Sequence, residues 1–151
     1  MEKPVSVIIP AYNHQNYVQD TIKSIINQTY QNIDLIIIDD GSTDRTWQKI
    51  LEMKADCEKH FKNAHFETKE NEGTTRTLKK LLSLANGEYV YIIASDDIIK
   101  PSAIEKQVDF LNKNSIYSLV VGNNELIDSN GRICYWDKRR NIVYEKLTQN
   151  T

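Results

Sequence analysis

Short runs of aliphatic residues alternate along most of this chain with longer segments in which apolar residues recur every three or four positions. The runs predict buried strands, and the periodic segments predict helices with one apolar face. We expect strands at residues 5–9, 33–38, 65–68, 88–93 and 117–121, with Pro10 ending the first and an edge position for the third. We expect helices at residues 17–29, 43–59, 74–85 and 101–112.

The alternation of strands and helices indicates an α/β protein. It predicts βαβ crossovers and a mostly parallel central sheet flanked by helices on both faces, in a single domain covering residues 1–151. In such sheets ligands bind beyond the carboxyl ends of the strands. Three polar clusters occupy those ends, and they are Ala11-Tyr12-Asn13, Asp39-Asp40-Gly41-Ser42 and Ser95-Asp96-Asp97.

Composition narrows the class of protein. The chain has 151 residues, of which 40% are hydrophobic and 26% charged, with a net charge of −2. These values are typical of one soluble globular domain and give no reason to expect nucleic acid as a partner. No apolar run approaches the roughly 18 residues that span a bilayer. Cys57 and Cys134 lack metal-ligand spacing, and the N-terminus lacks a signal-peptide pattern, so we expect reduced thiols in a cytoplasmic protein.

Asp96 and Asp97 interrupt the apolar run at residues 91–99. Adjacent carboxylates repel each other and resist desolvation, so folding alone does not favour them there. Mg²⁺ and Mn²⁺ take oxygen ligands and share their shell with substrate phosphates. With Ser95 beside it, the pair is therefore a candidate metal site, although a solvated turn or a helix cap before Pro101 stays an alternative.

The other polar clusters also allow two interpretations. Asp39 and Asp40 either accept hydrogen bonds from a nucleobase or ribose, or serve a strand-to-helix turn. Tyr12 either stacks on a base or is an aromatic at the rim. Arg76 and Lys79 either meet a diphosphate or are solvated charges on a helix.

The remaining charged features are expected at the surface. The histidines His14, His60 and His65 lack ligand spacing. The basic run at residues 138–140 is expected to be solvated, with contact to anionic lipid as the alternative. Residues 129–132 predict a turn between two extended segments.

Taken together, these clusters resemble the family 2 glycosyltransferases of the GT-A fold. The matching pieces are VSVIIPAYNHQNYVQDTIKSIINQTYQNIDLIIIDDGSTDRT and NEGTTRTLKKLLSLANGEYVYIIASDDIIKPSAIEK, and the likeness runs from about residue 5 to residue 128. The resemblance implies a Rossmann-like fold, a nucleotide-sugar donor with UDP as the default nucleotide, and Mn²⁺ or Mg²⁺ as the cofactor. By position, Pro10, Ala11 and Tyr12 match the loop that packs on the base, and Asp40 matches the acid that recognises it, with Asp39 beside it.

The metal motif of the family, aspartate-x-aspartate, falls on residues 94–97. The resemblance implies that Asp97 ligates the ion directly and that Asp96, next to Ser95, faces the ribose or the shell of the metal. Many members carry aspartate where Ala94 stands, whereas others keep only the adjacent pair. The arginine-asparagine step of the family falls on Leu78 and Lys79, so Arg76 or Lys79 is expected to serve the diphosphate.

The resemblance also implies a reaction, an inverting transfer in which a carboxylate base activates an acceptor hydroxyl and the metal neutralises the diphosphate. Family members usually continue beyond this length, so we expect only the donor-binding half here, with the base beyond Thr151. The expected acceptor is a glycan or a lipid-linked molecule used in polysaccharide assembly, and peripheral association with the inner face of a bacterial membrane stays open. A non-catalytic nucleotide-binding module and a phosphoacceptor receiver domain remain alternatives.

Overall fold

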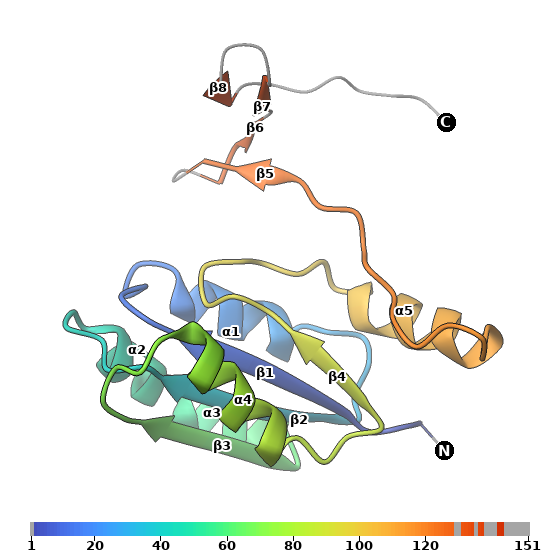
Figure 1. Cartoon of the computed structure of the whole chain (residues 1–151), viewed down its shortest axis with the longest axis horizontal. Coiled ribbons are helices and arrows are strands. Elements are labelled where there is room, and N and C mark those ends of the chain that lie inside the picture. The colour runs from blue at the N-terminus through green and yellow to red at the C-terminus, as the bar shows by residue number, and fades with distance from the viewer. Residues whose placement is uncertain (1, 129–130, 135, 138–141, 144–151) are drawn as a thin grey trace. The chain divides into compact units, whose positions relative to one another are not determined.

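The computed structural model describes the chain except for residues 1, 129–130, 135, 138–141 and 144–151, drawn as a grey trace in Figure 1. The basic run at 138–140 and part of the predicted turn at 129–132 therefore lie outside the described residues. The chain divides into two compact units, residues 1–118 and residues 119–151. The first unit carries all of the predicted site residues.

A four-stranded parallel sheet forms the centre of the first unit (Figure 1). Its strands are β1 (Val5–Ala11), β2 (Ile33–Asp39), β3 (Asn63–Thr68) and β4 (Tyr89–Ile92), in the order β3-β2-β1-β4. The register pairs Val5 with both Ile33 and Tyr89, so β1 lies in the middle. The parallel α/β architecture and the edge position of β3 confirm the predictions from the sequence.

Helices cover both faces of this sheet, which explains why its central strands are apolar at almost every position. One face packs against α1 (Val18–Ile26), α2 (Thr46–Glu52), α3 (Lys54–His60) and α5 (Ala103–Lys113) in the larger core cluster. The opposite face packs against α4 (Thr74–Leu84), whose Leu81 joins Ile8, Ile36 and Ile38 in a smaller cluster. Figure 1 shows α4 in front of the sheet. The alternation of side chains along a strand sends neighbouring residues of β1 into different clusters.

The first strand passes through Pro10 and does not end there. The Ile8 carbonyl accepts a hydrogen bond from Ile93 N, on the β4 side, and the Ala11 carbonyl accepts one from Asp40 N, on the β2 side. Because alternate residues bond to the same side, the missing N–H of Pro10 falls on the β4 side. Pairing with β4 has already ended at the Ile8 and Ile92 pair, so Pro10 breaks no ladder bond there.

Two further predictions from the sequence were wrong in detail. The helix expected at residues 43–59 is two helices, α2 and α3, which meet at Met53. The strand expected at residues 117–121 is absent from the described structure, and the apolar residues there are exposed, Leu119 by 75% and Val121 by 81%. A strand needs a partner for its backbone groups, and within the described residues this segment pairs with none.

The second unit contains two short antiparallel pairs. One joins β5 (Leu126–Ile127) to β6 (Ile133–Cys134), and the other joins β7 (Trp136–Asp137) to β8 (Ile142–Val143). Between β5 and β6, Asp128 N donates to the Arg132 carbonyl at 2.9 Å, and the Asp128 carboxylate accepts from Arg132 N at 2.9 Å. These bonds confirm the predicted turn between two extended segments as far as its residues are described.

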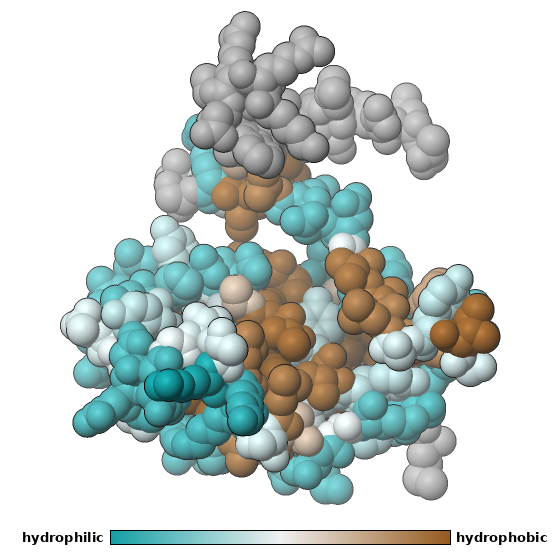
Figure 2. All heavy atoms as spheres, viewed as in Figure 1, coloured by the Kyte–Doolittle hydropathy of each residue, from teal (hydrophilic) through white to brown (hydrophobic). Residues whose placement is uncertain are grey.

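Apolar side chains also lie at the surface of the first unit. Figure 2 shows them gathered in the middle of the viewed face, over the region of α4 and β4. Leu82 of α4 and Val90 and Ile92 of β4 are between 42% and 55% exposed. In the described part of the chain, no helix is both long and apolar enough to cross a membrane.

Candidate functional site

The loops that follow β1 and β2 are joined by hydrogen bonds into a single rim. Asp40 N donates to the Ala11 carbonyl at 2.8 Å, and Asn13 N donates to Ser42 Oγ at 2.9 Å. In return, Thr43 N donates to Asn13 Oδ1 at 2.8 Å. Asn13 has a φ of 53°, a left-handed conformation that asparagine tolerates better than most residues. The two polar clusters predicted from the sequence therefore form one structure at the carboxyl edge of the sheet.

Asp39 is buried and its carboxylate is fully engaged in shaping this rim. The residue is only 1% exposed. Oδ2 accepts from Ser42 N at 3.2 Å and from Thr68 Oγ1 at 2.9 Å, while Oδ1 accepts from Ser42 Oγ. Of the two interpretations, the structure gives Asp39 the hydrogen bonds of the strand-to-helix turn.

Asp40 is equally buried, and it forms an ion pair with Lys69, which directly follows β3. Its Oδ1 also accepts from Glu72 N at 3.1 Å. Burial acts to raise the pKa of Asp40, but the hydrogen bonds from Lys69 and Glu72 N outweigh it and hold that pKa below its ordinary value. Burial acts to lower the pKa of Lys69, and its hydrogen bonds to Asp40 and Glu72 raise it overall.

Lys69 was not singled out from the sequence. It lies in the segment Lys69-Glu70-Asn71-Glu72-Gly73 between β3 and α4, where its charge resembles any surface lysine. The signal that could have found it is its position directly after a strand, the criterion that selected the aspartates. Gly41 shows how closely this segment approaches the rim, because a Cβ at Gly41 would lie 2.7 Å from Asn71 N. Gly41 also has a φ of +69°, which glycine adopts most readily.

The third cluster, Ser95-Asp96-Asp97, follows β4 and differs from the second. Ser95 is 1% exposed, whereas Asp96 and Asp97 are both exposed. Asp97 N donates to the Ala94 carbonyl at 3.2 Å, which closes a tight turn. Partial burial and the neighbouring charge of Asp96 raise the pKa of Asp97, while His14 acts in the opposite direction. This corner therefore carries negative charge that the fold does not fully compensate.

Asp96 and Asp97 fit a divalent cation that takes its remaining ligands from a substrate. Among the residues that the structure describes, no group of three or more carboxylate, imidazole or thiol side chains is arranged to hold a metal ion. Mg²⁺ is usually bound by one or two carboxylates together with substrate phosphates, so a full protein cage is not required. The pair Asp96 and Asp97 meets that smaller requirement.

His14 is the second residue that the sequence reasoning missed. We expected it at the surface without a role, but it is partly buried in the loop after β1. Its Nδ1 lies 2.7 Å from Ser95 Oγ, and its Nε2 lies 3.7 Å from Asp96 Oδ2. His60 and His65 are exposed, as predicted. Metal-ligand spacing could not reveal His14, whereas its place in a strand-end loop could have.

The remaining predicted residues lie nearer the solvent. Tyr12 is 43% exposed, between the buried Ala11 and the rim residue Asn13. Arg76 lies in the first turn of α4, the end of that helix nearest the carboxyl edge, and Lys79 lies three residues further on. At about 1.5 Å of rise per residue, Lys79 is about 4.5 Å further from the edge along the helix. Both side chains are exposed, so Arg76 is the better placed of the two.

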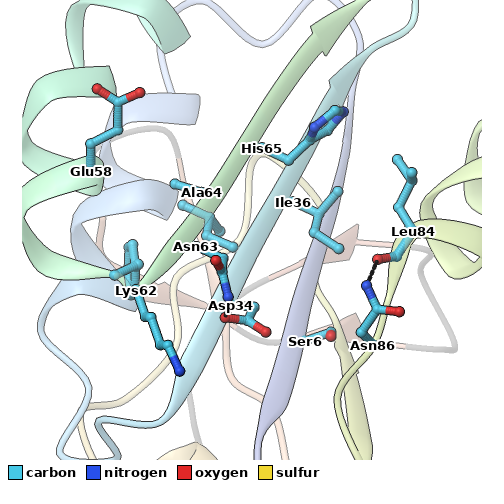
Figure 3. Close-up of a pocket in the computed structure, with 12 residues that line it drawn as sticks. Ser6, Asp34, Ile36, Glu58, Lys62, Asn63, Ala64, His65, Leu84 and Asn86 are labelled. Carbon is cyan, nitrogen blue, oxygen red and sulfur yellow. Dashed lines mark hydrogen bonds between the residues drawn. The ribbon is translucent and has the colours of Figure 1, made fainter.

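A hollow of about 700 Å³ lies at the other end of the sheet (Figure 3). It is bordered by Ser6, Asp34 and Asn63, near the amino ends of three strands, and by Leu84 and Asn86 at and just after the end of α4. Figure 3 shows Asn86 bonded to the Leu84 carbonyl, at 3.0 Å. None of the predicted site residues lines this hollow, so its size does not identify the functional site.

Known proteins are similar to this chain in both sequence and fold. The glucosyltransferase WfgD of Escherichia coli, named UDP-Glc:alpha-D-GlcNAc-diphosphoundecaprenol beta-1,3-glucosyltransferase, is 32% identical over 146 residues, which is 97% of this chain and 55% of that protein. An uncharacterised glycosyltransferase of Haemophilus influenzae is 44% identical over 110 residues, 73% of this chain and 33% of that protein. The chain thus spans about half the length of the first relative and a third of the second.

Solved structures confirm the fold. The mannosyltransferase PcManGT from Pyrobaculum calidifontis, in complex with GDP-Man and Mn²⁺, matches with a TM-score of 0.67 at 23% identity, over 74% of this chain and 33% of that one. TarS 1-349 of S. aureus in complex with UDP-GlcNAc matches with a TM-score of 0.65 at 21% identity, over 85% of this chain and 41% of that one. The model of the family described as glycosyl transferase family 2 matches residues 6–151. This chain belongs to glycosyl transferase family 2.

Proposed function

We propose that the chain is the donor-binding part of an enzyme that transfers a sugar from a nucleotide-diphosphate sugar to an acceptor hydroxyl. The observation that carries this proposal is the exposed pair Asp96 and Asp97, placed at the carboxyl edge of a family 2 fold beside the loops of β1 and β2. Family membership excludes the receiver-domain alternative. We further propose that residues 1–151 belong to one glycosyltransferase domain.

The identity of the donor is proposed from proteins that are similar to this chain. WfgD is named for UDP-Glc, and TarS has a complex with UDP-GlcNAc, whereas PcManGT has a complex with GDP-Man. All three are nucleotide-diphosphate sugars, and we take UDP as the nucleotide. The name of WfgD also contains a diphosphoundecaprenol acceptor, which supports a lipid-linked or glycan acceptor in polysaccharide assembly at the cytoplasmic face of the membrane.

Each residue at the edge has a proposed part in binding the donor. Asp97 and Asp96 would hold Mn²⁺ or Mg²⁺, and an ion bound there would neutralise the diphosphate as it leaves. Arg76, at the start of α4, would meet the diphosphate from the other side. Tyr12, which directly follows Pro10 and Ala11, would stack its exposed ring on the base.

Asp40 and Lys69 are assigned to the base pocket together. Lys69 Nζ already contacts Asp40, the Glu70 carbonyl and Glu72, so its part is to hold the Asp40 carboxylate in place. A carboxylate held there would accept a hydrogen bond from the N–H on the edge of a uracil. Asp39 supports this pocket by holding Ser42 and Thr68.

Titration calorimetry on the chain tests the proposal. We expect UDP to bind in the presence of Mn²⁺ more tightly than GDP or dTDP, and to lose most of its affinity when Mn²⁺ is removed. Asp97→Ala should show the same loss with Mn²⁺ present, while Asp109→Ala on the exposed side of α5 should bind like the wild type. Equal binding of UDP by the wild type and Asp97→Ala would remove the metal from the proposal.

The proposed reaction is an inverting transfer, in which a carboxylate base takes the proton of the acceptor hydroxyl. We assign no base within the described residues. A non-catalytic nucleotide-binding module would bind UDP with Mn²⁺ equally well, so binding and transfer must be measured separately. Release of UDP from UDP-glucose, dependent on both Mn²⁺ and an added acceptor, distinguishes an enzyme from a binding module.

A further inference from the structure

The ring of His14 connects two loops that are far apart in the sequence. Its Nδ1 lies 2.7 Å from Ser95 Oγ, a residue 81 positions away. Its Nε2 lies 3.7 Å from Asp96 Oδ2. One imidazole therefore contacts both the loop after β1, to which it belongs, and the loop after β4. It approaches Asp96 from the side of the rim.

The backbone of His14 is held firmly, so the ring stands on a fixed base. His14 N donates to Thr46 Oγ1 at 2.7 Å, at the start of α2. Its carbonyl accepts from Tyr17 N and Val18 N, both at 3.0 Å, at the start of α1. The ring of Tyr17 stands edge-on to the imidazole, with centroids 6.3 Å apart. On the other side, Ser95 is 1% exposed, so its contact with the ring is shielded from solvent.

Of the two contacts of the ring, only the one with Ser95 is short enough to be a hydrogen bond, and the chemistry of the three groups limits the role of each. An ionised carboxylate only accepts, whereas a serine hydroxyl both donates and accepts. A neutral imidazole with its proton on Nε2 accepts from Ser95 at Nδ1 and presents its N–H to Asp96. One tautomer therefore suits both neighbours, with Nδ1 accepting from Ser95 and the Nε2 side facing Asp96 across 3.7 Å.

We propose that His14 is a positioning residue, which holds Asp96 so that the pair Asp96 and Asp97 presents its oxygens to a divalent cation in a fixed arrangement. The inference rests on the proposed function, because it takes the acid pair as the cation site. Groups that orient metal ligands typically contribute about 10–100-fold to metal affinity. Among the described residues no third carboxylate, imidazole or thiol joins Asp96 and Asp97 in an arrangement that could hold a metal, so the orientation of the two acids depends on their neighbours.

Three substitutions at His14 separate its two contacts. The amide of asparagine falls near the place of Nδ1, so His14→Asn keeps an acceptor for Ser95 and loses the contact with Asp96. The longer side chain of glutamine places its N–H₂ near Nε2, so His14→Gln reaches Asp96. His14→Phe keeps the ring and loses both contacts. His60→Gln, on an exposed histidine at the end of α3, is the matched control.

The experiment follows the backbone amide signals of the 151-residue chain by NMR while Mn²⁺ is added in the presence of UDP. Paramagnetic broadening of Asp96 and Asp97 reports occupancy of the site. We expect His14→Asn to need about tenfold more Mn²⁺ than the wild type, His14→Phe at least as much, and His14→Gln to recover most of the affinity. His60→Gln should match the wild type. Thermal unfolding of each variant confirms that it is folded.

The inference and the proposed function fail through different results. Equal Mn²⁺ requirements in the wild type, His14→Asn and His14→Phe would overturn the role of His14 and leave the cation site standing. Absence of broadening in the wild type would overturn the cation site. In that case the metal-free spectra decide the positioning role: unchanged signals of residues 94–97 in His14→Phe overturn it, and shifts absent from His60→Gln support it.

Discussion

Two pairs of aspartates lie at the same edge of one sheet, and their surroundings are opposite. Asp39 ends β2 and Asp40 follows it; both are at most 4% exposed, and their carboxylates accept from Ser42, Thr68 and Lys69. Asp96 and Asp97 follow β4 and are exposed, with His14 as the nearest partner of Asp96. The pKa of Asp40 is lowered and that of Asp97 is raised.

This difference separates carboxylates whose charge the fold compensates from carboxylates that can take an external cation. A buried carboxylate whose oxygens already accept hydrogen bonds has its negative charge compensated within the protein. An exposed pair in which the pKa of Asp97 is raised has charge that an external cation can compensate. In the sequence the two pairs look alike, because each is two aspartates after an apolar strand. What distinguishes them is the supply of donors from other segments.

The largest effect is expected from removing the cation that pairs with Asp40. Lys69→Met leaves a buried carboxylate without its counter-charge, which should lower the free energy of unfolding by about 3 kcal/mol. Urea denaturation measures the change. Lys79→Met, on the exposed side of α4, is the control and should stay within about 0.5 kcal/mol of the wild type. If both variants were equally stable, the ion pair would not support the fold.

The next effect compares one member of each pair by the same substitution. Asp39→Asn places an N–H₂ group against Ser42 or Thr68 donors, and should lower the free energy of unfolding by about 2 kcal/mol. Asp96→Asn changes an exposed side chain and should stay within about 0.5 kcal/mol. Both are measured by urea denaturation without metal. A larger loss in Asp96→Asn than in Asp39→Asn would reverse the comparison.

Acid should remove the contribution of Asp40 gradually. Because its pKa is lower in the folded chain than in the unfolded chain, its contribution is complete above the unfolded value of about 3.9 and is lost as pH falls through the folded value. We therefore expect the stability difference between the wild type and Lys69→Met to be largest near neutral pH and to shrink as the pH falls, because a buried Asp40 without Lys69 takes up a proton more readily. A difference independent of pH down to acid unfolding would contradict this.

The smallest effect expected on the free energy of unfolding is an increase, whereas the substitutions above lower it. The raised pKa of Asp97 means that its ionised form is disfavoured in the folded chain at neutral pH. Asp97→Asn should therefore stabilise the metal-free chain slightly, by less than about 1 kcal/mol because the site is exposed. The same variant should lose Mn²⁺ binding. Thermal unfolding without metal tests the stability, and calorimetry with Mn²⁺ and UDP tests the binding. A lower stability of Asp97→Asn would contradict the view that the ionised form of Asp97 is disfavoured in the folded chain.

The sequence predicted the elements that depend on local pattern. Strands that are buried on both faces are apolar at almost every position, so residues 33–38 could be identified without knowledge of their neighbours. The edge with three polar clusters followed from the same alternation. Local pattern failed at Pro10, because its tolerance in β1 depends on where β4 ends. It failed again at residues 117–121, which have the composition of a strand but no partner in the described structure.

The partners in the site could not be predicted, because they come from distant segments. Lys69 and Asp40 are 29 positions apart, and His14 and Ser95 are 81 positions apart. A single lysine or histidine in a loop carries no mark of such a contact in one sequence. The acids were identified because they are unusual in an apolar context, whereas their partners are ordinary residues in ordinary loops.

The central position of β1 also sets the order in which the site can assemble during synthesis. Asn13 and Ser42 are only 29 residues apart, so the rim can form once β2 and the loop after it have been synthesised. His14 must wait for Ser95, and at about 5–20 residues per second the delay is about 4–16 s. In that interval the β4 side of β1 has no strand to pair with. The rim formed by the loops after β1 and β2 is thus an early product of translation, and the contact of His14 with the loop after β4 forms later.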